Sequence, residues 1–219
     1  MTGNITATSE AAFSEILRHV AQGLPLNASQ SEKAFGLIMD GVAGDVRIAG
    51  FLMALRARGE TADELLGAVR AVRARMKTVP DAPEGTIDVC GTGGDGHGTL
   101  NISTSVAFVL AALGVPVAKH GNRALSSRAG ASDVLEALGV ALRDDAAELG
   151  ASLHEDRLAF LAAPLHHPAM RHAGPARREL GVRTLFNLIG PMCNPAHVTR
   201  QQIGVSNPAF PHTILPVPQ

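Results

Sequence analysis

Two polar, glycine-containing stretches each lie at the end of a short apolar run, and their residue types suit the binding of an anion. The first, DVCGTGGDGHGTLNIST, spans residues 88–104, and the second, KHGNRALSSRAGAS, spans residues 119–132. Glycines let a ligand approach the backbone closely, while helix-start N–H groups and cationic side chains bind phosphate oxygens. The two stretches therefore predict adjacent loops that bind a ligand carrying more than one phosphate. A metal ion on that ligand could contact Ser103 or Asp95.

The first stretch formally matches GxGxxG between Gly91 and Gly96. The dinucleotide-binding form of this motif requires an acidic residue about 20 positions further on. No acidic residue lies between Asp95 and Asp133, and no Lys-Ser or Lys-Thr pair follows the glycines as a P-loop requires. What remains is a glycine loop that precedes a helix. An ordinary glycine turn with a capping asparagine, Asn101, is the alternative interpretation.

The elements that position these loops follow from the hydrophobic pattern. The segment 78–86, TVPDAPEGT, has the prolines and glycine of a linker or hinge. After it, predicted strands and helices alternate, which favours a mainly parallel sheet covered by helices. In such a sheet, ligands bind outside the carboxyl ends of the strands, where both loops would meet. The predicted strands are 87–90, 116–119, 158–162 and 202–206, and the predicted helices are 102–113 and 132–138.

The residues before the linker repeat apolar side chains at helical spacing, in segments 11–23, 27–41, 46–58 and 61–76. Asn27 is a predicted cap, and Thr61 to Glu64 forms a predicted capping box. Four short helices cannot bury the apolar faces around Phe13, Phe35 and Phe51 alone, so we expect a second domain or a second subunit to cover them. The predicted domains are a helical domain at 1–77, a hinge at 78–86 and an α/β domain at 87–219.

The composition excludes several classes of protein. The chain has 219 residues, of which 46% are hydrophobic, with 19 basic and 20 acidic residues and no Trp or Tyr. A broad basic surface for nucleic acid is therefore not expected. No apolar run approaches the roughly 18–20 residues that span a bilayer, and the N-terminus does not resemble a secretion signal. Cys90 and Cys193 fit no metal-ligand spacing and are expected to be reduced thiols. These observations predict a cytoplasmic globular protein that binds neither nucleic acid nor membrane.

Six short segments occur in order along the chain: GTGGD (91–95), NIST (101–104), KHGNRALSS (119–127), HHPAM (166–170), RRELGVRT (177–184) and NLIGPMCNPA (187–196). In this set the sequence resembles the anthranilate phosphoribosyltransferases, from the N-terminal helices to about Asn207. The resemblance implies a small helical domain plus a larger α/β domain, in the manner of nucleoside phosphorylases, with dimerisation through the helical domain. It implies transfer of the phosphoribosyl group of phosphoribosyl pyrophosphate to the amine of anthranilate. Pyrophosphate is released, Mg²⁺ is the cofactor, and the step is the second of tryptophan biosynthesis.

The resemblance also assigns roles to individual residues. Anthranilate would contact Gly91, Asn122 and Arg177, and Arg177 suits its carboxylate because a guanidinium can pair with it through two hydrogen bonds. Ser103 would be a ligand of Mg²⁺. His120 is a candidate general base, with a hydrogen-bonded orienting role as the alternative. Phosphoribosyl pyrophosphate would be held by Gly91, Gly94, Asp95, Thr99, Asn101, Ile102, Ser103, Thr104, Lys119, His120, Gly121, Asn122, Arg123, Ala124, Leu125, Ser126, Ser127 and Ala131.

Other conspicuous residues have structural interpretations. The pair His166-His167 suggests a metal site, but adjacent helical residues face different directions and no further ligand is suitably spaced, so we expect packing, capping or substrate-channel roles. Cys90 ends a buried strand and is expected to be an inert apolar residue. Ala131-Ser132 stands where the family commonly has Ser then Ala.

The C-terminal sequence also departs from the family. After VSNPA the family continues into a helix, further strands and an Asp-Glu pair that binds magnesium. Here the tail reads FPHTILPVPQ, whose prolines at 211, 216 and 218 oppose a helix. The sequence therefore predicts a truncated or frame-altered product with an incomplete α/β domain and slow turnover. Two alternatives to the transferase stay open: a non-catalytic remnant that binds ligand or dimerises, and a pyrimidine nucleoside phosphorylase-like enzyme.

Overall fold

The structure is a computed structural model that describes residues 2–92, 101–123 and 130–205, with side chains from residue 7 onward. Its chain divides into two compact units. Of the described residues, the helical unit comprises those up to 75 together with 169–189, and the sheet unit comprises 76–168 together with 190–205. The sequence placed everything after residue 86 in the α/β domain, whereas the structure groups 169–189 with the helices. The boundaries at 77 and 86 stay predictions.

The helical unit contains more elements than the sequence predicted. The capping boxes at Asn27 and Thr61 are both present, since each side chain accepts a hydrogen bond from the backbone three residues on and each backbone N–H is bound in return. The elements are α1 (Thr2–Ala21), α2 (Ala28–Met39), α3 (Asp45–Arg58) and α4 (Ala62–Arg73), followed after a long interval by η1 (Pro168–Ala173), α9 (Gly174–Leu180) and α10 (Leu185–Ile189).

Aromatic rings form the centre of the helical unit. Phe13, Phe35 and Phe51 are fully buried, and the Phe51 ring centroid lies 5.6 Å from that of Phe13 and 5.5 Å from that of Phe35. Phe186 of α10 lies 5.2 Å from Phe35 in an edge-to-face arrangement. The apolar surplus that the sequence assigned to a further domain or subunit is therefore covered around Phe35 by a segment of the same chain.

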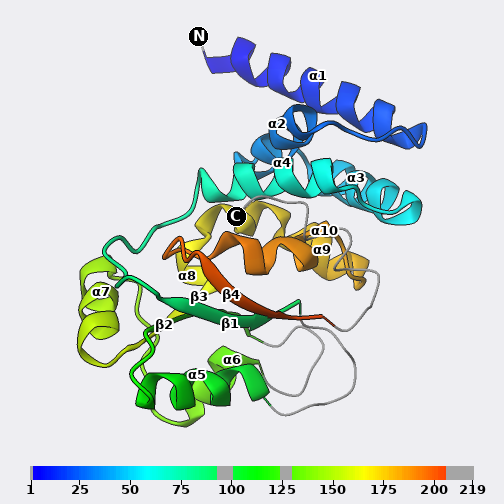
Figure 1. The fold of residues 1–219 in the computed structure, drawn as a ribbon. Helices are drawn as coiled ribbons and strands as arrows, with labels where there is room; N and C mark the ends of the chain where they lie inside the picture. The colour runs from blue at the N-terminus through cyan, green and yellow to red at the C-terminus, as the bar shows by residue number, and fades with distance from the viewer. Residues whose placement is uncertain (1, 93–100, 124–129, 206–219) are drawn as a thin grey trace. The chain divides into compact units, whose positions relative to one another are not determined.

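The sheet unit confirms the predicted fold class. Its four described strands are all parallel, in the order β3-β2-β1-β4 (Figure 1). Parallel strands require crossover connections, and the helices supply them. The elements are β1 (Ile87–Gly91), α5 (Ile102–Ala112), β2 (Val117–Gly121), α6 (Ala131–Ala137), α7 (Ala146–Glu155), β3 (Leu158–Ala162), α8 (Ala163–His166), η2 (Gly190–Cys193) and β4 (Arg200–Gly204).

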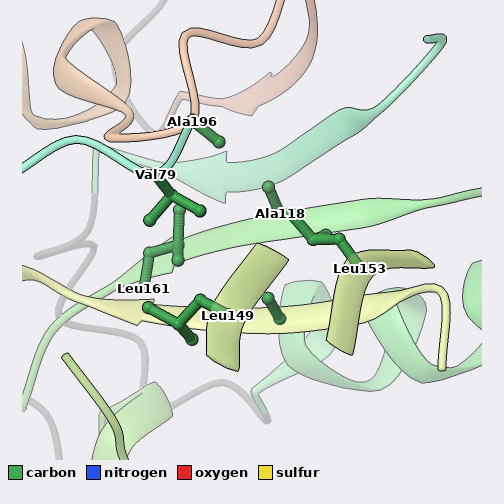
Figure 2. Close-up of a cluster of buried hydrophobic side chains, with 7 residues drawn as sticks. Val79, Ala118, Leu149, Leu153, Leu161 and Ala196 are labelled. Atoms are coloured by element: carbon green, nitrogen blue, oxygen red, sulfur yellow. The ribbon is translucent and has the colours of Figure 1, made fainter. Parts of the chain in front are cut away.

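The two faces of the sheet are covered differently. On one face, Val89 and Val117 pack against Ala107 of α5, which Figure 1 shows together with α6 on the same side of the strands. On the other face, Ala118 belongs to an apolar cluster with Leu153 of α7 (Figure 2). Because side chains alternate along a strand, consecutive residues of β1, and likewise of β2, point to opposite faces of the sheet. The two loops predicted from the sequence follow β1 and β2.

Several local expectations differ in detail. The fourth strand begins at Arg200 rather than 202, and α1 begins nine residues before the segment predicted as helical. Helix α7 was not predicted, although Asp145 caps its first turn and Leu149 and Leu153 recur at helical spacing. Among the helices of the described residues, none is both long and apolar enough to cross a membrane.

Candidate functional site

Three neighbouring strands end in glycine at the carboxyl edge of the sheet. The residues are Gly91 of β1, Gly121 of β2 and Gly204 of β4, and Gly91 is paired in register with Gly204. A Cβ atom at Gly91 would lie 3.2 Å from the Gly204 carbonyl oxygen, and one at Gly121 would lie 3.1 Å from the Cβ of Ala131. A side chain at Gly91 or Gly121 would be crowded, and with glycine at all three positions this edge presents backbone, which suits a phosphate ligand.

Lys119 supplies a buried positive charge close to this edge. Its side chain is only 4% exposed, and its ammonium group donates a hydrogen bond of 2.8 Å to the Val89 carbonyl oxygen. Burial lowers the pKa of Lys119, while the charge of Asp88 acts in the opposite direction. Lys119 also lines a small cavity together with Gly121, Ala131 and Ser132. Because an ammonium group has three donors, it can bind an anion at this edge while keeping its bond to Val89.

The start of α5 lies at the same edge because the helix crosses from β1 to β2. The Asn101 carbonyl oxygen accepts hydrogen bonds from the N–H groups of Thr104 and Ser105, both at 3.0 Å. Asn101 and Ser103 are partly exposed, Ile102 is exposed and Thr104 is buried. The structure therefore leaves Asn101 and Ser103 accessible at the helix start, while the Thr104 side chain points into the packed interior. The Ser103 hydroxyl is an oxygen donor of the kind that Mg²⁺ binds.

The backbone beyond β2 is held against the first turn of α6. The Asn122 carbonyl oxygen accepts a hydrogen bond of 3.3 Å from Ser132 N–H, and the Asn122 side chain accepts one of 2.8 Å from Arg123 N–H. The Arg123 guanidinium forms ion pairs with Asp133 and Glu136 of α6. Asn122 is exposed and accessible to a ligand, whereas the charge of Arg123 is already engaged by two carboxylates.

The opposite face of the sheet carries a buried polar layer, formed by Asp88, His120, Asn194 and Gln201. Asp88 is fully buried, and its carboxyl group accepts hydrogen bonds from His120 N–H at 3.1 Å and from the Gln201 side chain at 3.3 Å. Gln201 also donates to the Pro191 carbonyl oxygen at 2.6 Å, and Asn194 donates to the Ala118 carbonyl oxygen at 2.9 Å. The layer thus joins β1, β2, β4 and the segment after η2.

Burial changes the protonation of this layer. It raises the pKa of Asp88, against the opposing effect of its hydrogen bonds with Asn194 and His120. It also raises the pKa of the neighbouring Cys90 thiol far above its usual range, with the charge of Asp88 adding to the effect. The thiol therefore stays protonated, in keeping with the expected inert role. Asp88 was not predicted as a site residue, although a carboxylate within an apolar strand is visible in the sequence.

His120 contacts protein atoms through both ring nitrogens. Nδ1 lies 3.1 Å from the Gly190 carbonyl oxygen, and Nε2 lies 3.2 Å from Nε2 of His167. Burial lowers the pKa of His120 to about 3 and that of His167 to about 4, so both rings are neutral near pH 7. This geometry favours the hydrogen-bonded orienting role of His120 over the role of general base, and both remain predictions.

The adjacent pair His166-His167 has separate partners. The Nδ1 atom of His166 lies 3.0 Å from the Lys77 carbonyl oxygen, while His167 faces His120. In the parts of the chain that the structure describes, no group of three or more His, Cys, Asp and Glu residues could hold a metal ion. Both rings take part in hydrogen bonding and packing here.

Arg177 lies on α9 in the helical unit. Its guanidinium carbon lies 5.1 Å from the centre of the Phe186 ring, which is a cation–π arrangement. Burial lowers the pKa of Arg177, and no carboxylate of the described residues forms an ion pair with it. A partly desolvated guanidinium of this kind is well suited to a carboxylate ligand. Gly91 and Asn122, the other predicted anthranilate contacts, belong to the sheet unit.

Several predicted site residues lie outside the described residues. They are Gly94, Asp95, Thr99, Ala124, Leu125, Ser126 and Ser127. The C-terminal tail that departs from the family also lies outside the described residues.

Comparison with known proteins identifies a family for both units. Residues 84–215 match the model described as glycosyl transferase family, a/b domain, and residues 14–76 match the model described as glycosyl transferase family, helical bundle domain. The anthranilate phosphoribosyltransferase of Gluconobacter oxydans is 62% identical over 198 residues, which are 90% of this chain and 54% of the relative. That of Beijerinckia indica is 54% identical over 198 residues, 90% of this chain and 58% of the relative.

Solved structures give the same result. The anthranilate phosphoribosyltransferase of Thermus thermophilus matches with a TM-score of 0.85 and 43% identity, over 90% of this chain and 60% of that one. The Saccharomyces cerevisiae enzyme in complex with PRPP and Mg matches with a TM-score of 0.84 and 27% identity, over 93% of this chain and 61% of that one. The chain thus spans a little over half the length of the curated relatives it matches.

Proposed function

Because the chain belongs to the glycosyl transferase family, we propose that it functions in anthranilate phosphoribosyl transfer. In this reaction a bond forms between the anthranilate amine nitrogen and C1 of the ribose, and the bond from C1 to pyrophosphate breaks. The product keeps the phosphoribosyl group, and the amine loses a proton. This assignment places the chain in the second step of tryptophan biosynthesis.

One observation carries the proposal. Three adjacent parallel strands end in glycines, and the buried ammonium of Lys119 lies beside that edge. This combination of exposed backbone and fixed positive charge suits a diphosphate better than a neutral ligand, because each phosphate oxygen needs a donor or a cation. The names of the matched relatives favour the phosphoribosyltransferase over a pyrimidine nucleoside phosphorylase-like enzyme.

The residues divide by their expected contribution. Gly91 and Gly121 leave room for the ligand, Lys119 and the start of α5 supply donors, and Asn122 is exposed at the end of β2. The phosphoribosyl pyrophosphate set assigned by resemblance, from Gly91 to Ala131, is proposed to form the site, most members by contacting the ligand and Arg123 by positioning those that do. These residues would act by positioning the two substrates and by stabilising charge. Holding the amine of anthranilate against C1 of the ribose would supply a large part of the rate enhancement.

Magnesium fits the proposal as a partner of the substrate. The Ser103 hydroxyl would bind it as one oxygen ligand. When bound, Mg²⁺ would offset the negative charge that collects on departing pyrophosphate.

Arg177 would bind the anthranilate carboxylate, and a substitution tests this directly. Arg177→Ala should weaken anthranilate binding by about 1.5–3 kcal/mol, the contribution of a charged hydrogen bond. Binding of Mg–phosphoribosyl pyrophosphate should change little. The control is Arg178→Ala, since Arg178 neighbours Arg177 on the same helix and is exposed. Calorimetric titration of both ligands measures the two affinities, and equal losses for both in Arg177→Ala would refute the assignment.

Activity itself is tested by the loss of anthranilate fluorescence on addition of phosphoribosyl pyrophosphate and Mg²⁺. Turnover supports the transferase, whereas binding of both ligands without turnover identifies the non-catalytic alternative. Conversion of a pyrimidine nucleoside with phosphate would identify the phosphorylase. We also propose a homodimer formed through the helical unit, where Val46 is 87% exposed, and a cytoplasmic location.

A further inference from the structure

Arg123 is bound to α6 by a bidentate ion pair and a second carboxylate. Its Nη1 atom lies 2.8 Å from Oε2 of Glu136 and 3.2 Å from Oδ1 of Asp133, and its Nη2 atom pairs with Oε1 of Glu136. Both terminal nitrogens of the guanidinium are thus engaged. Bidentate pairs of this type fix geometry as well as charge.

Asp133 also accepts a hydrogen bond from Gly130, which lies on the other side of residues 124–129 from Arg123. Its second oxygen, Oδ2, accepts a hydrogen bond of 2.7 Å from Gly130 N–H. Residues 124–129 connect Arg123 to Gly130 along the chain, so a single carboxylate is bonded to the residues on both sides of that stretch. The hydrogen bond from Ser132 N–H to the Asn122 carbonyl oxygen, at 3.3 Å, holds the same two backbone segments together.

We infer that Arg123, Asp133 and Glu136, here called the clasp, are positioning residues for the phosphoribosyl pyrophosphate site. The clasp sets the distance between the end of β2 and the start of α6, where Gly121 and Ser132 line the same cavity as Lys119. Arg123 acts through the two carboxylates and not as a phosphate ligand. The inference rests on the proposed function, because it names what the clasp positions.

Charge balance supports this role. With Arg123 in place, the three side chains carry a net charge of −1, and without it the two carboxylates of α6 would present −2 close to an anionic ligand. A phosphate that drew Arg123 away would have to break a bidentate pair and face that repulsion. The side chains of Arg123 and Glu136 are 54% and 44% exposed, and exposed ion pairs contribute little to folding stability. Clasp variants should therefore fold.

A charge-reversal series separates the clasp from direct phosphate binding. Arg123→Glu and Glu136→Arg should each weaken Mg–phosphoribosyl pyrophosphate binding about five- to tenfold in calorimetry, because each breaks the ion pair. The double variant restores an opposite-charge pair and should bind within about threefold of wild type. A double variant as weak as Arg123→Glu alone would overturn the inference, since it would show that the cation itself contacts the ligand.

Glu136→Gln gives a second, independent outcome. The clasp predicts weaker binding when this carboxylate is neutralised, whereas a phosphate-binding Arg123 would be released and binding would be unchanged or tighter. The matched control is Arg143–Glu148, a pair of 2.8 Å in the same unit with side chains 59% and 54% exposed. Reversal of its charges, singly or together, should leave affinity unchanged.

Hydrogen–deuterium exchange of the ligand-free protein separates failure of the clasp from failure of the proposed function. The Gly130 amide should exchange faster in Asp133→Asn and in Glu136→Arg than in wild type, and unchanged exchange in both would overturn the clasp. Absence of Mg–phosphoribosyl pyrophosphate binding by wild type would refute the proposed function instead, and the exchange rates would then decide the clasp alone.

Discussion

Replacement of Asp88 by alanine tests the polar layer beneath the candidate site. The fully buried carboxyl group accepts from His120 N–H at 3.1 Å and from the Gln201 amide at 3.3 Å. Gln201 keeps its 2.6 Å bond to the Pro191 carbonyl oxygen and Asn194 keeps its 2.9 Å bond to the Ala118 carbonyl oxygen, so the main loss falls on His120 N–H. Each buried donor left without a partner costs about 1–3 kcal/mol.

Relief of burial offsets part of that loss. The raised pKa of Asp88 shows that the ionised carboxylate is disfavoured where it lies, and alanine removes that cost. The net decrease in the free energy of unfolding should be about 1–2 kcal/mol for Asp88→Ala, from the lost partner of His120 N–H less the relieved burial. Asp88→Asn keeps one oxygen acceptor but turns an amide N–H₂ toward a donor on Gln201, so its cost should be about half as large.

Urea denaturation at pH 7 measures the series, with Asp144→Ala as control because Asp144 is an exposed partner of Lys77. The expected order of destabilisation is Asp88→Ala, then Asp88→Asn, then Asp144→Ala with little change. The pH dependence gives a further check. Because the folded-state pKa of Asp88 is raised above 3.8, the stability advantage of wild type over Asp88→Asn should shrink as pH rises through that folded-state pKa. An Asp88→Ala variant as stable as Asp144→Ala would refute the reasoning.

Two further predictions concern the histidines and assembly. The pKa values of His120 and His167 are lowered to about 3 and about 4 in the folded protein. Below about pH 6.5 the unfolded state therefore binds more protons than the folded state. The free energy of unfolding should fall as the pH is lowered from about 7.5 to about 5, by up to about 1.4 kcal/mol per pH unit for each ring. His120→Gln should reduce that fall in urea titrations, and equal slopes in the variant and wild type would contradict the assignment. For the proposed dimer, light scattering at micromolar concentration should give twice the chain mass, and Val46→Glu should lower it. A wild-type mass equal to one chain would exclude the dimer.

Local patterns in the sequence were sufficient for much of the fold. The caps at Asn27 and Thr61 and the alternation of strands and helices after residue 86 depend on contacts within a few residues, and the structure confirms them. The ends of the elements were less accurate, because tertiary packing extends or shortens a helix or strand. The sequence also predicted that a glycine-rich stretch follows β1 and that a cationic stretch begins at the end of β2, because both stretches come directly after apolar runs.

The contacts and the burial of the site residues could be learned only from the tertiary structure. His120 has its ring partners 70 and 47 residues away in the chain, and those contacts make it a neutral, doubly engaged ring rather than an evident base. The ion pair between Arg123 and Glu136, 13 residues further along the chain, was not evident from the sequence. Phe186 joined the helical unit because it packs on Phe35. Periodicity fixes which face a residue occupies, but burial, pairing and charge depend on segments that only folding brings together.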